Sequence, residues 1–121
     1  MSALPTTKVQ AIHGDTIPMR VFDIVDFDGN AVSNLTGWSV WFTVKAKATD
    51  PDPGVLQKST AAGTIATSGG TALWSISATE SKASFTAGQK YVFDVQLRDS
   101  QGRVGTVVKG MLIIEEEITN E

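Results

Sequence analysis

His13 is the only histidine in this 121-residue sequence, so most acid–base chemistry would depend on it. A Ser–His–Asp relay needs an imidazole beside an activated serine. The sequence has no G-x-S-x-G turn to present such a serine. His13 precedes Gly14 and Asp15, where a strand is expected to give way to a turn. We therefore expect a solvated loop histidine there, and no catalytic residue.

The run Asp26-Phe27-Asp28-Gly29-Asn30 carries carboxylates that resemble the start of a calcium loop. An EF-hand loop needs glycine at its sixth position and a bidentate glutamate at its twelfth. Counted from Asp26, glycine comes fourth instead, and Gly37 stands in the twelfth place. Asp, Asn and Gly are also the usual turn residues. The run therefore predicts a turn with positive φ at Gly29, and no metal site.

Other chemistry-bearing residues also lack the necessary spacing. Gly69-Gly70 is not followed by the Lys-Ser or Lys-Thr pair of a phosphate-binding loop. Asp50 and Asp52 lie in a proline-rich loop that gives two carboxylates no fixed geometry. The chain has no cysteine, which excludes disulfides and thiolate metal sites. We expect a protein that is not an enzyme and has no cofactor, metal or small-molecule substrate.

The composition is that of one globular domain, with 41% hydrophobic and 19% charged residues. The net charge of −3 and the pI near 5.0 differ from the basic footprint of a nucleic-acid binder. The N-terminus lacks the features of a signal peptide, and the apolar stretch 104–114 is too short to cross a membrane. We expect a protein that is made in a cytoplasm, stays soluble until it assembles, and contacts neither nucleic acid nor membrane.

Period-two alternation of apolar and polar residues recurs along the chain, separated by Gly, Asp, Asn and Pro clusters. It predicts strands at 7–13, 16–25, 38–47, 55–59, 64–67, 71–77, 89–98 and 104–115. One helical turn is expected near residues 79–85, in the segment 78–85 between two strands, with Thr79 as its N-cap. This pattern predicts an all-β, immunoglobulin-like antiparallel β-sandwich of seven to eight strands, with an up-and-down barrel as the alternative. The expected parts are an N-terminal arm with the first strand (1–13), the sandwich (14–115) and an acidic tail (116–121).

Local details follow from the same pattern. A bulge or twist is expected near Val21, because the alternation changes face there. Tyr91 stands at a strand start, where a Tyr-corner hydroxyl bonds back to nearby backbone. Gly102 is expected to hold the left-handed position of the 99–103 hairpin turn.

A set of apolar residues falls on the strand faces opposite the predicted core. In an immunoglobulin-like sandwich their strands share one sheet, so they would gather into one outer patch. Monomeric proteins seldom expose such a patch unless it binds something. The alternatives are scattered surface residues, which are common singly, or a patch covered by the loop after Lys47. The predicted protein-interface residues are Trp41, Val92, Val107, Met111 and Ile113.

Two segments, Leu35-Thr36-Gly37-Trp38 and residues 88–97, are the most specific parts of a family pattern that covers roughly residues 14–115. In this pattern the sequence resembles the immunoglobulin-like N-terminal domain of bacteriophage upper-baseplate proteins. It implies a virion structural protein that docks onto other virion subunits, as a homo-oligomer within the particle. We expect no receptor-binding or fibre domain after residue 121, so that either a separate protein recognises the host or this domain decorates a head or connector.

The sequence therefore predicts a phage virion protein that docks onto tail, baseplate or connector subunits through sheet-face and edge contacts. A capsid decoration protein is the first alternative. It would use the same sheet-face and edge contacts to bind the capsid lattice. A carbohydrate-binding module, with Trp41 as a stacking platform, is an alternative of another class.

Overall fold

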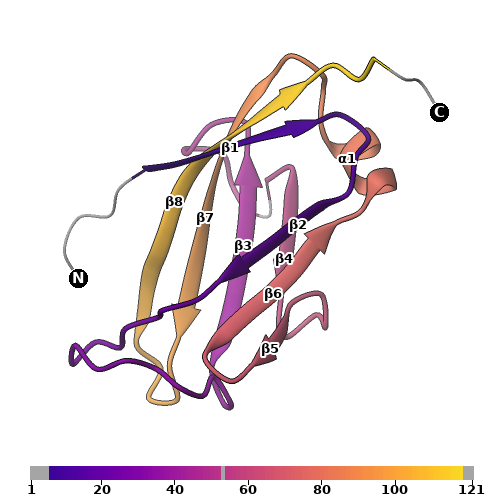
Figure 1. Ribbon diagram of the computed structural model, residues 1–121. Coiled ribbons are helices and arrows are strands. Elements are labelled where there is room, and N and C mark those ends of the chain that lie inside the picture. The colour runs from indigo at the N-terminus through magenta and orange to yellow at the C-terminus, as the bar shows by residue number, and fades with distance from the viewer. Residues whose placement is uncertain (1–5, 53, 119–121) are drawn as a thin grey trace.

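The structure is a computed structural model that describes residues 6–52 and 54–118, with the side chain of residue 6 left aside. It has two facing layers of β-structure and one short helix (Figure 1). The elements are β1 (Thr6–Ile12), β2 (Ile17–Val21), β3 (Ser39–Lys45), β4 (Leu56–Ser59), β5 (Ala66–Ser68), β6 (Thr71–Ile76), α1 (Ala78–Ser84), β7 (Lys90–Arg98) and β8 (Val104–Glu115). Most of the expected N-terminal arm (1–5) and the end of the acidic tail (119–121) lie outside the described residues.

The strands form a five-stranded sheet, in the order β1-β8-β7-β3-β4, and a three-stranded sheet, in the order β2-β6-β5. Figure 1 shows the smaller sheet in front of the larger one. This order is that of an immunoglobulin-like sandwich, as predicted, and two separate sheets rule out the barrel. One pairing differs from the antiparallel prediction: β1 runs parallel to β8. The alternation of apolar and polar residues within a strand indicates which face is buried, but it carries no information about the direction of the neighbouring strand.

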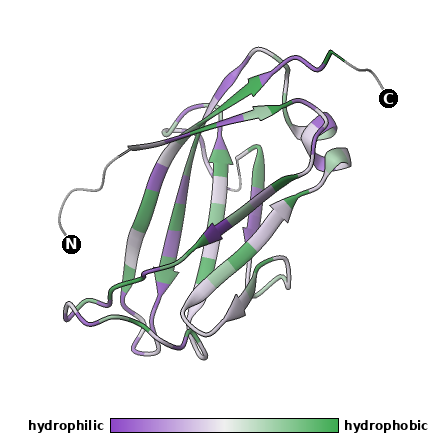
Figure 2. Ribbon diagram, viewed as in Figure 1, coloured by the Kyte–Doolittle hydropathy of each residue, from purple (hydrophilic) through white to green (hydrophobic). Residues whose placement is uncertain are grey.

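The core lies between the two inner faces. Phe42 of β3 stands at its centre, with ring centroids 5.1 Å from Trp74 and 5.6 Å from Phe93. Figure 2 shows apolar and polar residues alternating along the strands, as expected for sheets with one face dry. The fully buried large side chains are Phe42, Leu35, Ile76, Leu112, Ile114, Val40, Val44 and Val95.

The strand predicted at 16–25 is shorter, because β2 ends at Val21. The change of face occurs at Asp23, which has φ 54, rather than at Val21. This left-handed residue resets the alternation, so that Phe22 is 56% exposed while Ile24 is only 3% exposed. Aspartate tolerates this backbone region better than most non-glycine residues.

The N-cap of helix α1 is Ser77, not the predicted Thr79. The Ser77 hydroxyl accepts a hydrogen bond from Glu80 N, and the Glu80 carboxylate accepts one from Ser77 N. This reciprocal capping box satisfies two backbone donors at the start of the helix.

Three predicted local details are confirmed, two of them around β7 and one in the turn after Asp26. The Tyr91 hydroxyl accepts a hydrogen bond from Thr86 N at 2.8 Å, which is the expected Tyr corner. Gly102 has φ 83 in the hairpin turn that leads to β8, and Gly29 has φ 86 in its own turn. Glycine takes these backbone angles without a β-carbon clash.

Candidate protein-docking site

His13 is half-buried and makes a specific contact, contrary to the prediction of a solvated loop histidine. Its Nε2 lies 3.0 Å from the carbonyl oxygen of Phe85, and Gly14 N donates to Ser81 Oγ at 3.0 Å. These contacts fasten the β1–β2 turn to α1. The turn signal around Gly14 was correct, but it could not show that a helix packs against the turn.

The turn at Asp26 uses its carboxylate internally. Asp26 Oδ1 accepts hydrogen bonds from Asp28 N and Asn30 N, both at 2.9 Å. Asp28 faces Arg103, with 3.7 Å between carboxylate and guanidinium. Among the described residues, no group of three or more His, Asp or Glu side chains could hold a metal ion. The arrangement is that of an Asx-type turn, as expected from the residue types.

The outer face of the five-stranded sheet carries three of the five predicted interface residues together. Val92 of β7 is directly opposite Met111 of β8, and Ile113 is two residues further along β8. Their neighbours Leu112 and Ile114 are fully buried, so Met111 and Ile113 point outward. All three are partly exposed. We call Val92, Met111 and Ile113 the outer apolar cluster.

Trp41 lies on the same face but does not belong to this cluster. It pairs with Gln96, whereas Val92 pairs with Lys45, four residues further along β3. That offset corresponds to roughly 14 Å along the strand. The Arg98 guanidinium also lies 5.4 Å from the centre of the Trp41 ring, where it covers part of an aromatic surface predicted to be exposed.

Val107 does not join the cluster either. The β7–β8 register shifts between Val95 and Gln96, which are opposite Val108 and Thr106, so Val107 is the extra residue of a β-bulge. It is partly buried and packs against the hydrophobic core. The single patch of five residues is therefore replaced by a cluster of three, with the other two elsewhere.

A groove of about 370 Å³ runs beside the outer apolar cluster. Val92 and Met111 line it, together with Thr43, Asp94 and Lys109 from the next row of the sheet. Burial raises the pKa of Asp94, and hydrogen bonding from Gln96 opposes this shift. The row of Thr43, Asp94 and Lys109 is therefore polar. It lies between the row of Val92 and Met111 and the row of Trp41, and so it separates the outer apolar cluster from Trp41.

The loop after Lys47 forms one wall of this groove. Ala48 and Asp52 line it, and Asp52 pairs with Lys45 at 2.8 Å. Because the side chains of the cluster remain partly exposed, the loop flanks the cluster without covering it completely.

A larger, open hollow of about 780 Å³ lies near β2, β4 and β6. Its charged residues include Lys58 and Glu80, whose side chains bond each other at 2.9 Å. Trp74 lines it too, but Trp74 Nε1 is buried and has no hydrogen-bond partner among the described residues. Its Lys58–Glu80 pair is satisfied within the chain and Trp74 Nε1 is enclosed, which leaves Arg20 as its exposed charged residue and makes it the weaker candidate site.

Two exposed large apolar side chains, those of Phe22 and Val25, were not predicted from the sequence. Phe22 and Val25 are 56% and 51% exposed in the loop after β2. The sequence signal was the apolar alternation through residues 16–25, which suggested a continuous strand there. Phe22 continues the outward-facing set of Pro18 and Arg20, and the left-handed backbone at Asp23 then turns Ile24 into the core.

No family model matches the sequence, and no curated protein matches it. Among solved structures, the chain is similar to Drosophila OTK, extracellular domains 3-5, with a TM-score of 0.40 and 12% sequence identity. The alignment covers 91% of this chain and 33% of that one, so this chain spans about one third of its length. Within the described residues, no helix has the length and apolar character needed to cross a membrane.

Proposed function

We propose that this chain is a structural protein of a bacteriophage particle, without catalytic activity, that docks onto neighbouring tail, baseplate or connector subunits. The observation that carries the proposal is the outer apolar cluster, whose three side chains adjoin one another on one sheet face yet remain partly exposed. The resemblance of residues 35–38 and 88–97 to phage baseplate domains supplies the virion context. The protein would be made in the host cytoplasm and become part of the virion.

Docking would use two features of the five-stranded sheet. Burial of Val92, Met111 and Ile113 under a partner removes apolar surface from water, which favours association. β1 is an edge strand of the same sheet, and edge strands offer unpaired backbone groups to a strand of another chain. The face would provide most of the apolar contact, and the edge would fix the orientation of the partner.

The test is incorporation of variants into particles. Met111→Asp places a charge in the cluster, and because the side chain points outward the domain should still fold. Leu73→Asp is the matched control, since Leu73 is 38% exposed on the other sheet. We expect Met111→Asp to be absent from purified particles and Leu73→Asp to be present. Normal incorporation of Met111→Asp would contradict the proposal.

A capsid decoration role would use the same surface in another part of the particle. The copy number per particle distinguishes the two locations, because a tail or baseplate ring holds few copies whereas a capsid lattice holds many. Quantitative mass spectrometry of purified particles would measure it.

A further inference from the structure

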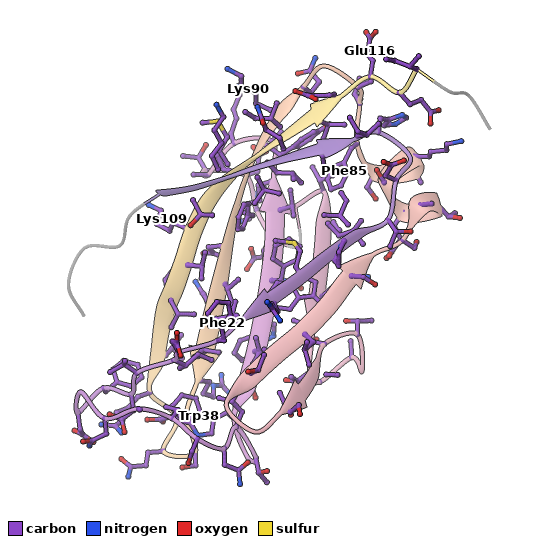
Figure 3. All side chains as sticks on the ribbon, in the orientation of Figure 1. Phe22, Trp38, Phe85, Lys90, Lys109 and Glu116 are labelled. Carbon is purple, nitrogen blue, oxygen red and sulfur yellow. The ribbon has the colours of Figure 1, made fainter. Side chains whose placement is uncertain are left out.

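The outer face of the five-stranded sheet is rich in lysine, although the whole chain has a net charge of −3. Lys8 is opposite Met111, and Lys90 is opposite Ile113. Lys109 is the next outward residue along β8, and Figure 3 labels it and Lys90 on the ribbon. All three lysines are exposed, and none forms an ion pair with a residue that the structure describes. The outer apolar cluster is thus flanked by positive charge, of which only that of Lys109 lies opposite a carboxylate, that of Asp94.

A surface with the complementary character lies in the loop between β2 and β3. We call residues 22–31 the acidic loop. It combines the exposed apolar side chains of Phe22 and Val25 with the carboxylates of Asp23, Asp26 and Asp28. Two cations lie beside it: the Arg20 guanidinium is 5.4 Å from the centre of the Phe22 ring, and that of Arg103 is 3.7 Å from the Asp28 carboxylate. Figure 1 shows it at the end of the sandwich opposite α1.

The acidic loop is held in place by the domain. Ile24 is buried in the core, and its carbonyl oxygen accepts a hydrogen bond from Val32 N at 2.8 Å. Val25 and Ala31 form an isolated β-bridge across the loop. A loop fixed in this way presents Phe22 and Val25 outward without the ordering cost that a flexible segment pays on binding.

We infer that the outer apolar cluster and its lysines bind the acidic loop of a second copy of this chain. This inference rests on the proposed docking role of the sheet face and names its occupant. Phe22 and Val25 would cover the cluster, and the loop carboxylates would face Lys90 and Lys109. Opposite charges on the two surfaces favour this partner over a copy that presents its own lysine-rich face.

The contact is heterologous, because the face and the loop are different surfaces of the same molecule. A copy that binds through its sheet face still has a free acidic loop, and a copy that binds through its acidic loop still has a free sheet face. Such contacts close into a ring when the rotation between copies permits and otherwise extend into a filament. A symmetric two-fold dimer is not expected.

The test uses two complementary variants of the full chain. The face variant carries Lys90→Glu and Lys109→Glu. The loop variant carries Phe22→Lys and Val25→Lys. Each of these side chains is exposed, so both variants should fold, as circular dichroism would verify. Thr79→Glu and Leu73→Lys each introduce one charge, negative and positive respectively, at exposed positions of α1 and β6 and serve as controls for the sign of the charge.

Analytical ultracentrifugation would measure self-association. We expect the wild type and the controls to associate, less strongly as salt is raised, and each double variant to associate at least about tenfold more weakly. An equimolar mixture of the two variants should form one-to-one dimers and nothing larger, because only one intact face and one intact loop remain per pair.

A wild type that stays monomeric, or a mixture that does not form dimers, would overturn this inference. The proposed function is tested separately by particle incorporation of Met111→Asp. If that variant is excluded from particles while the wild type is monomeric in solution, the docking face stands and its occupant is another subunit.

Discussion

The Lys58–Glu80 ion pair gives a stability prediction in which the two partners are not equivalent. Lys58 Nζ donates to both carboxylate oxygens of Glu80 at 2.9 Å, and the same carboxylate caps α1 through Ser77 N. The Lys58 side chain is 8% exposed, whereas that of Glu80 is 37% exposed. Removal of the glutamate charge leaves a buried cation, but removal of the lysine leaves a carboxylate that water can still reach.

The expected magnitudes follow from this asymmetry. Removing one partner of a fully buried pair costs about 3–5 kcal/mol, and the exposure of Glu80 reduces this to about 2 kcal/mol for Glu80→Gln. Glutamine keeps the hydrogen bond from Ser77 N through its amide oxygen, so the loss is mainly electrostatic. Lys58→Met replaces the buried charge with an apolar side chain and should change the unfolding free energy by less than about 1 kcal/mol. The double variant should resemble Lys58→Met.

The pH dependence has a defined sign. The hydrogen bond from Ser77 N and the contact with Lys58 lower the pKa of Glu80 in the folded state below its usual 4.5. A carboxylate of this kind stabilises the fold above its unfolded pKa, and that stability is lost as pH falls through the lower folded pKa. The difference between wild type and Glu80→Gln should therefore be full at pH 7 and should shrink below pH 4.5.

Urea denaturation of the wild type, the two single variants and the double variant, at neutral and acidic pH, would measure these differences. For a domain of this length the loss in Glu80→Gln corresponds to a Tm about 8 °C lower. The reasoning would be refuted if Lys58→Met were as destabilising as Glu80→Gln, or if the effect of Glu80→Gln were independent of pH.

Three further predictions concern the large sheet. Phe42→Ala should lower the unfolding free energy by about 3–5 kcal/mol in urea denaturation, because Phe42 is fully buried at the centre of the core. Gly110→Ala should lower the denaturation midpoint and increase hydrogen exchange in β1, because a β-carbon there would overlap the Phe93 ring and lie 2.6 Å from the Thr7 carbonyl oxygen. Asp94→Asn should raise the denaturation midpoint at pH 7, because burial raises the pKa of Asp94 and its charged form therefore costs stability. That gain should disappear in acid, as pH falls through the raised pKa and the wild-type carboxyl becomes protonated.

The strands with one dry face were predictable because their alternation is set by burial. The stretch predicted at 104–115 is β8 with the same bounds, and that predicted at 71–77 is β6 to within one residue. The Ser-x-x-Glu spacing of the capping box was also present in the sequence at Ser77 and Glu80, so the true start of α1 could have been read from it. Asp23 is different, because no sequence pattern distinguishes an aspartate in left-handed backbone from one in a strand or a turn.

The candidate site was only partly predictable, because alternation identifies the face of a residue but not its row in the sheet. Trp41 and Met111 both point outward as expected, yet the pairing of Trp41 with Gln96 and of Val92 with Met111 sets them in different rows. Between them lies the polar row of Asp94 and Lys109. Row positions depend on register, and register depends on turn lengths and on the bulge at Val107, which only long-range pairing reveals.

The same rows explain why the sheet face can be specific as well as adhesive. An apolar cluster alone would bind any apolar surface, including a second copy of itself. Lys8 and Lys90, in the rows of Met111 and Ile113, place positive charges beside the cluster, so that two copies brought face to face would repel each other. A partner with acidic groups around its apolar centre avoids that repulsion, and the loop that carries Phe22 and Val25 has this composition. The positive flank therefore selects the partner, and the apolar cluster supplies the buried area.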